Sequence, residues 1–218
     1  MQTRSRVYSK HEELANSLSH GLGIVLGIGG AIFLFSKESV AGDSWAIVSV
    51  IIYLFGMLSS YITSTWYHAT NEPAKKLLLQ KIDHAAIYLH IAGTYTPFTL
   101  VSLREYGLWG WGLFAFIWLS AIVGVIVSAR RSGRHSYVET ACYVIMGCTI
   151  FIAFKPLIDC LSIADKMDSI YWLVAGGVSY IVGALFYSLA KVRFMHTVFH
   201  FFVLGGSLCH IIAIYIAL

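Results

Sequence analysis

The chain has 218 residues, of which 58% are hydrophobic, 15% are aromatic and only 12% are charged. Soluble domains carry about 25% charged residues, so this composition excludes a soluble enzyme, a disordered chain and a disulfide-stapled secreted domain. The formal net charge of +4 comes from basic residues that lie between apolar runs, which argues against a nucleic-acid-binding stripe. Three of the four cysteines lie inside apolar runs and are interpreted as small hydrophobic residues.

Seven apolar segments of about 20 to 23 residues are long enough to cross a hydrocarbon core of ~30 Å. In chain order they are Leu14–Phe35, Ser44–Trp66, His84–Leu103, Leu108–Ala129, Tyr137–Pro156, Ser169–Ala190 and His196–Leu218. The connections are short, and no alternating polar–apolar strands are present. We therefore expect an all-α, seven-transmembrane helix bundle that forms one domain over residues 1–218, with a short cytoplasmic arm over residues 1–13.

The first segment is too long for a signal-peptide core and is expected to be retained. Glu13, Asn16 and His20 open it at spacings of three and four residues, which places them in one polar stripe near its beginning. They are candidates for a polar network near a site, and the alternative is helix-to-helix polar contact without a site.

The second and third segments add polar residues at corresponding positions. Ser64 and His68 lie at the end of the second segment, four residues apart and therefore on one helical face. Asp83 and His84 open the third segment. His90 lies deeper on this helix, where we expect a core hydrogen bond to a neighbouring helix or a place in the polar network.

Further residues of note lie in the third, fifth and seventh segments. Pro97 is expected to kink the third segment, and Glu139 is the one charged residue between Tyr137 and Phe154 in the fifth. The seventh segment opens with His196 and His200, again four residues apart. His210 lies about 15 Å further along this helix, too far to share a site with His200.

These polar residues come from four segments and lie at one depth, and ionisable residues within a span indicate function by default. His68, His196 and His200 could converge on one ion. Three protein ligands with an open fourth position are typical of catalytic zinc, and neutral imidazole favours zinc over calcium or magnesium. Asp83 could orient a water at that position or act as its base, and Ser64 could bind the same water or a substrate carbonyl. Haem ligation by His68 and His196 is an alternative.

Basic residues predict the orientation of the bundle. Eleven of the Lys and Arg residues lie in the N-terminal arm and in the second, fourth and sixth connections, and four lie on the opposite side. The first group is Arg4, Arg6, Lys10, Lys75, Lys76, Lys81, Arg130, Arg131, Arg134, Lys191 and Arg193, and the second is Lys37, Arg104, Lys155 and Lys166. We therefore expect a cytoplasmic N-terminus and an outside C-terminus.

On these residues the chain resembles the hemolysin III branch of the progestin and adiponectin receptor family, in its bacterial form. That family is part of a wider group of seven-helix membrane proteins that includes alkaline ceramidases. The matching motifs span nearly the whole chain and occur in order. They are Glu13-x-x-Asn16-x-x-x-His20, Ser64-x-x-x-His68, Asp83 and His196-x-x-x-His200.

The resemblance implies a seven-helix bundle in the cell membrane with a cytoplasmic N-terminus. It implies Zn²⁺ held by His68, His196 and His200 near the cytoplasmic face, with Asp83 and Ser64 as the catalytic residues beside it. The receptor branch suggests hydrolysis of a ceramide-like amide, and the hemolysin name implies red-cell lysis or pore formation by bacterial members.

Three functions compete. The first is a zinc-dependent hydrolase of a lipid amide or ester at the cytoplasmic leaflet, whose substrate chain enters the bundle from the bilayer; an acid and a hydroxyl beside three histidines favour it. The second is a non-catalytic regulator or sensor of membrane homeostasis with structural zinc, although structural zinc usually has four protein ligands. The third is a pore-forming cytolysin. A channel needs a continuous polar stripe, whereas these polar residues crowd one leaflet, which argues against an intrinsic channel. Membrane lipids are the expected partners.

Overall fold

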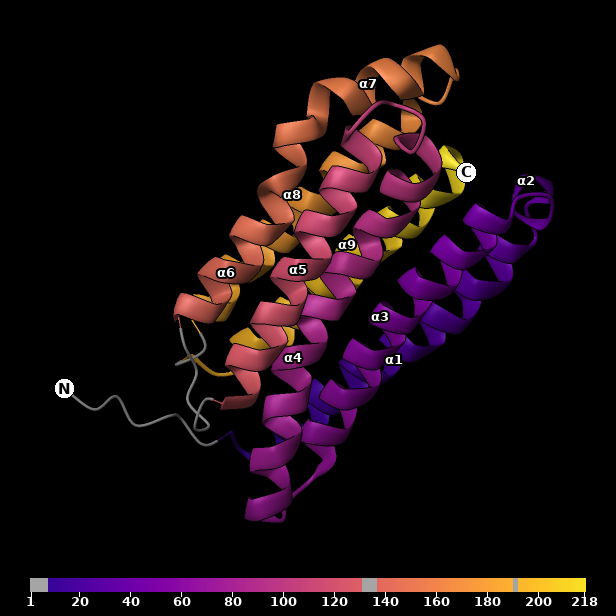
Figure 1. Ribbon diagram of the computed structural model, residues 1–218. Coiled ribbons are helices and arrows are strands. Elements are labelled where there is room, and N and C mark those ends of the chain that lie inside the picture. The colour runs from indigo at the N-terminus through magenta and orange to yellow at the C-terminus, as the bar shows by residue number, and fades with distance from the viewer. Residues whose placement is uncertain (1–7, 131–136, 190–191) are drawn as a thin grey trace.

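The computed structural model of this chain describes residues 8–130, 137–189 and 192–218. Over these ranges the chain is helical and contains no strand, as expected, and its long helices lie side by side in one bundle (Figure 1). The elements are α1 (Lys10–Phe35), α2 (Glu38–Ala41), α3 (Ser44–Ala69), α4 (Pro73–Pro97), η1 (Phe98–Ser102), α5 (Trp109–Arg130), α6 (Tyr137–Cys148), η2 (Thr149–Ala153), α7 (Phe154–Ile163), α8 (Asp168–Ser188) and α9 (Met195–Ala217).

Six helical segments in the described ranges are long and apolar enough to cross a membrane. They are Lys10–Phe35, Ser44–Ala69, Trp109–Arg130, Val138–Ile163, Asp168–Ser188 and Met195–Ala217. The helix α4, which holds most of the expected third segment, is not among them, because its first half carries several charged side chains.

The start of α1 differs from the sequence expectation. The helix begins at Lys10, inside the residues 1–13 expected to form an arm, because Ser9 and Glu12 form a capping box. The backbone N–H of Glu12 donates to the Ser9 hydroxyl at 3.3 Å, and the Ser9 N–H donates to the Glu12 carboxylate at 3.0 Å. These two bonds satisfy donors that a helix start otherwise leaves open.

Two other helix boundaries in the structure also differ from the expected ones. The third expected segment starts at Pro73 rather than His84, and at Pro97, where we expected a kink, its helix changes into a short π-helix, η1. The fifth expected segment does not end at Pro156. It continues through the 3₁₀ turn η2 into α7 and ends at Ile163, since proline is tolerated in the first turn of a helix.

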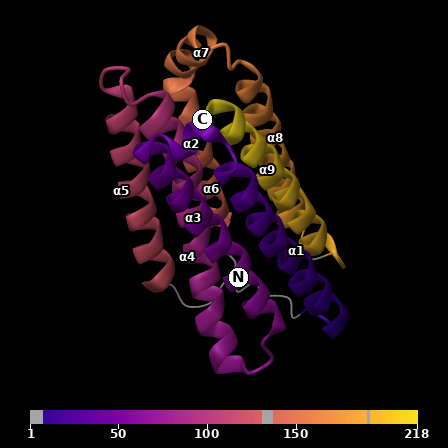
Figure 2. The same ribbon diagram turned by 90° about the vertical axis from the view of Figure 1, so that its right-hand side faces the viewer.

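The packing order brings four helix ends together. The helix α3 packs against α1 and α4, α4 packs against α5, and α9 packs against α8 and α1. Figures 1 and 2 show α2, α7 and the C-terminus at one end of the bundle and the α3–α4 connection at the other. The starts of α1, α4 and α9 and the end of α3 therefore lie at the same end, opposite the C-terminus.

Two lysines fix the far end of α9. The Lys37 ammonium donates to the Tyr215 carbonyl oxygen, and the Lys166 ammonium donates to the Ala217 carbonyl oxygen at 2.9 Å. Cations at these positions satisfy carbonyls that a helix C-terminus leaves open. Burial lowers the pKa of both lysines below the ordinary value, and in Lys37 the nearby Lys166 charge adds to that effect.

Candidate metal centre

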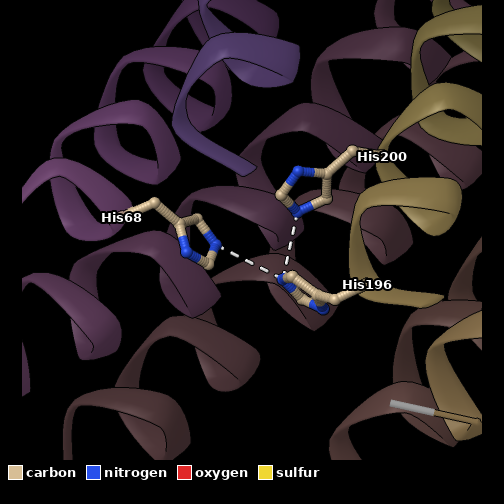
Figure 3. A group of neighbouring side chains, drawn as sticks. All are labelled: His68, His196 and His200. Carbon is tan, nitrogen blue, oxygen red and sulfur yellow. Dashed lines mark hydrogen bonds between the residues drawn. The ribbon is translucent and has the colours of Figure 1, made fainter. Parts of the chain in front are cut away.

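Three histidines converge where α3 ends and α9 begins (Figure 3). His68 lies in the last turn of α3, and His196 and His200 lie one turn apart at the start of α9. The Nε2 atom of His196 is 3.3 Å from that of His68 and 3.0 Å from that of His200. All three residues are buried, and their ligand atoms lie within 4.8 Å of one another, so the group could hold one metal ion.

The hydrogen bonds on the far side of two rings set their tautomers. His68 donates from Nδ1 to the Glu13 carboxylate at 2.7 Å, because a carboxylate only accepts. The Ser19 hydroxyl donates to the Asn16 carbonyl oxygen, so at 2.9 Å it accepts from His200 Nδ1. His68 and His200 therefore each present an unprotonated Nε2 toward His196, which is the form that binds a metal.

A lysine from α4 fixes the carboxylate of Glu13. The Lys76 ammonium lies 2.9 Å from Glu13 Oε1, and it also donates to the carbonyl oxygens of Tyr67 and Thr70 at the end of α3. One side chain thus ties together the start of α1, the end of α3 and the start of α4. Such outer partners orient a ligand and raise its basicity.

The start of α9 is held from α1. Phe194, which precedes the helix, has a left-handed backbone with φ of 61°, and its N–H donates to the Glu12 carboxylate at 3.2 Å. This conformation is costly for a bulky residue. The bond from Glu12 therefore stabilises the entry that sets the direction of His196.

The expected stripe of Glu13, Asn16 and His20 divides into three separate contacts. Glu13 binds His68, as described, and the amide oxygen of Asn16 accepts a hydrogen bond of 2.6 Å from the Thr197 hydroxyl on α9. The His20 ring lies against His200, with ring centroids 3.6 Å apart. All three residues surround the histidine cluster.

Asp83 and Ser64, the expected catalytic residues, are both buried, and the Ser64 side chain lies next to the Asp83 carboxylate. Both line a cavity of about 290 Å³ inside the bundle, and His196 and His200 line it as well. The structure therefore brings together in one space an acid, a hydroxyl and imidazoles that could bind a metal, the residue types that metal-assisted hydrolysis of a carbonyl compound needs.

One pair near the site was missed by the sequence analysis. His84 Nδ1 lies 3.2 Å from the Glu139 carboxylate on α6, both groups are largely buried, and both line the cavity. The Tyr143 hydroxyl donates to the His84 carbonyl oxygen at 3.0 Å. The sequence did contain a signal, since Glu139 is a single charge inside an apolar run and such residues need a partner.

Two further contributors to the site differ in how visible they are in the sequence. The capping-box pattern of Ser9 and Glu12 is visible there, but its second role, holding Phe194 of α9, depends on the packing of distant helices. Ser19 carried no signal, because one serine beside His20 does not indicate a bond to His200.

Comparison with known proteins places these features in a wider group. The sequence model of the family described as "Haemolysin-III related" matches residues 8–211. The chain is 42% identical to Hemolysin-3 of Bacillus cereus over 90% of its own length and 87% of that protein's. It is 39% identical to the Hemolysin-3 homolog of Bacillus subtilis (strain 168), over 92% of each chain. The human monocyte to macrophage differentiation factor is 30% identical, over 94% of this chain and 84% of the human one.

Proposed function

The chain belongs to the haemolysin-III-related family, and on that premise we propose that it holds Zn²⁺ at the histidine cluster and hydrolyses a lipid amide or ester. The observation that carries the proposal is the convergence of three Nε2 atoms beside a cavity that also contains Asp83 and Ser64. Three imidazole ligands with a carboxylate partner fit a catalytic zinc site, in which a fourth position takes substrate or water.

Family membership and the six long apolar helices make the chain a multi-pass membrane protein, and its Bacillus relatives indicate the bacterial cell membrane. To these six helices we add α4 as a seventh span. It packs between α3 and α5, and its Asp83, His84 and His90 line the cavity, which is where polar residues of a span are tolerated. Seven spans and the distribution of basic residues support a cytoplasmic N-terminus and an outside C-terminus.

The chain's own residues supply the remaining chemistry. Zinc at the cluster would polarise a carbonyl and lower the pKa of a water to about 7. Asp83 accepts a proton from the water that attacks the carbonyl carbon, and Ser64 orients that carboxylate. The bond from carbon to the amide nitrogen or ester oxygen then breaks, and the proton passes to the leaving group. The apolar chain of the substrate lies in the cavity, whose walls include Phe98 and Val144.

The experiment compares wild-type protein with Asp83→Asn in lipid hydrolysis. Purified protein is incubated with ceramide and with a phospholipid ester, and released fatty acid is measured by mass spectrometry. We expect release by wild type and loss of at least ~100-fold in Asp83→Asn, with metal content unchanged, since general-base groups contribute about 10²–10⁴-fold.

A non-catalytic regulator with structural zinc is the second candidate. The dense bonding that joins the cluster to α1 and α4 favours it, because the same bonds would hold the bundle together. If wild type and Asp83→Asn both contain metal and neither releases fatty acid, the result would support the regulator and contradict the hydrolase.

A further inference from the structure

A row of polar rings runs from the histidine cluster into the bundle. We call this group of rings the deep polar row; its members are His20, Tyr61, His90, Tyr180 and His210. From His20 onward, neighbouring ring centroids are 5.3, 5.9, 6.3 and 5.3 Å apart. His20 itself lies against His200, so the row starts at the candidate metal centre.

Glycines on neighbouring helices make room for the row. A Cβ at Gly23 would lie 2.2 Å from the Tyr61 ring, one at Gly206 would lie 2.7 Å from the Tyr180 ring, and one at Gly176 would lie 2.3 Å from the His210 ring. Any other residue at these positions would displace a polar ring. The backbone is thus adapted to keep the rings in the interior.

The tyrosines of the row have hydrogen-bond partners. Both hydroxyls lie within 2.8 Å of the Ser207 hydroxyl on α9. These bonds join α3 and α8 to α9 and suffice as interhelical contacts. A structural role therefore accounts for Tyr61 and Tyr180.

In the described part of the chain, the three histidines keep ring nitrogens without a partner, although His210 Nε2 donates to the Leu173 carbonyl oxygen at 3.3 Å. Within the described ranges, neither ring nitrogen of His20 has a hydrogen-bond partner, nor do Nε2 of His90 and Nδ1 of His210. All three residues are more than nine-tenths buried and line the cavity of about 290 Å³. A buried polar atom without a hydrogen-bond partner destabilises the folded chain. A purely apolar chain in the cavity would leave that cost in place, whereas a ligand with its own polar group would remove it.

The geometry fixes where that polar group would lie. His210 follows His200 by ten residues on α9, which corresponds to about 15 Å along a helix. His90 lies between these two depths, since its ring contacts both Tyr61 and Tyr180. If the carbonyl group of a long-chain lipid is held at the metal centre, the middle of its acyl chain therefore lies at the depth of the deep histidines, His90 and His210.

We propose that the deep half of the cavity is a hydrogen-bonding subsite, in which His90 and His210 bind a hydroxyl in the middle of a single long-chain amphiphile. The location of the amphiphile's carbonyl end at the histidine cluster rests on the proposed function. The subsite itself rests on the unpartnered nitrogens and the cavity. It selects for a hydroxylated chain over an unsubstituted one.

The test is a binding comparison that needs no turnover. Purified Asp83→Asn protein in detergent is loaded with a fluorescent fatty acid, which is displaced by 12-hydroxyoctadecanoate or by octadecanoate. We expect the hydroxylated acid to displace at an approximately five- to tenfold lower concentration, the value of about one net hydrogen bond. In the double variant His90→Phe with His210→Phe, we expect octadecanoate still to displace the probe. The preference for the hydroxylated acid is expected to disappear, apart from any difference in how the two acids partition into the detergent micelles.

Three controls separate this subsite from a structural role. His90→Gln keeps a donor and an acceptor and should retain most of the preference, and His11→Phe alters an exposed histidine and should retain all of it. Thermal unfolding and metal content identify a variant that is misfolded. Equal displacement by both acids in the parent protein, displacement by neither, or a preference that survives in the double variant would overturn the proposal. Hydrolysis by wild-type protein is measured separately and would still support the proposed function.

Discussion

The carboxylate of Glu13 determines which nitrogen of His68 is available to a metal. Glu13 accepts the Nδ1 proton of His68 at 2.7 Å and is itself held by Lys76 at 2.9 Å. Without that acceptor, His68 can adopt the other tautomer or turn its ring away. A ligand's outer partner therefore contributes to affinity although it never touches the metal.

Glu13→Ala is expected to lower zinc affinity by about 10–100-fold, the usual effect of removing such a partner. Competition with a chelator of known affinity measures it in purified protein. Glu38→Ala is the matched control, because Glu38 is exposed on α2 at the opposite end of the bundle. An affinity that is the same in both variants would show that the Glu13–His68 bond does not act on a metal.

Much of the site could be predicted at this scale, because the spacing of Ser64 and His68 and of His196 and His200 follows helical geometry. The assignment of these three histidines to a metal remains a prediction, although they do lie together. The bonds of Ser19 and Glu139 were not predicted, since each depends on which face of a distant helix is turned toward it.

At the scale of helices, close contact between α3 and α4 places Ser64 beside Asp83. A Cβ at Gly56 would lie 2.4 Å from the Leu89 carbonyl oxygen, and one at Gly93 would lie 3.1 Å from the Ile52 carbonyl oxygen. Small residues let two helix backbones approach in this way. At Gly56 the neighbouring atom belongs to the backbone, so the contact leaves no room there for a methyl group.

Gly56→Ala is expected to destabilise the bundle by about 1–3 kcal/mol through overpacking, which lowers the midpoint of thermal unfolding in detergent. Gly29→Ala is the matched control, because a Cβ there meets no atom within 4 Å. Alanine in that open helical position is expected to be neutral or stabilising by up to ~1 kcal/mol. Equal midpoints for the two variants would contradict the close contact of α3 and α4.

The existence of the helices was predictable from apolar runs, but some boundaries were not. The start of α4 was placed at His84 rather than Pro73, because its lysines are typical of a connection. In the folded chain one of them, Lys76, binds Glu13 and the end of α3. The extension of the fifth segment to Ile163 was not predicted, since the expected segment ends at Pro156, whereas proline lies there in the first turn of α7.

At the scale of the whole molecule, the antiparallel order of the helices gathers the candidate site residues at one end. The ends of α1, α3, α4 and α9 that carry them meet there, opposite the C-terminus. If α4 crosses the membrane, the crossings number seven and the two termini lie on opposite sides. If it does not, the number is even and both termini lie on one side.

Fusions at the two termini distinguish these topologies. We expect a fluorescent protein to fold at the N-terminus, in the cytoplasm, and alkaline phosphatase to be active only at the C-terminus, outside. Seven spans and the excess of basic residues on the N-terminal side give this result. Phosphatase that is inactive at both ends, with fluorescence from both, would contradict the seventh span.

The central claim is that His68, His196 and His200 hold a metal, and elemental analysis of detergent-purified protein tests it most directly. We predict about one zinc per chain in wild type and its loss in His196→Ala with His200→Ala, because a site with one remaining imidazole binds weakly. His210→Phe, a buried histidine on the same helix outside the cluster, is predicted to keep the metal. No stoichiometric metal in folded wild-type protein, or the same metal content in all three proteins, would contradict the account.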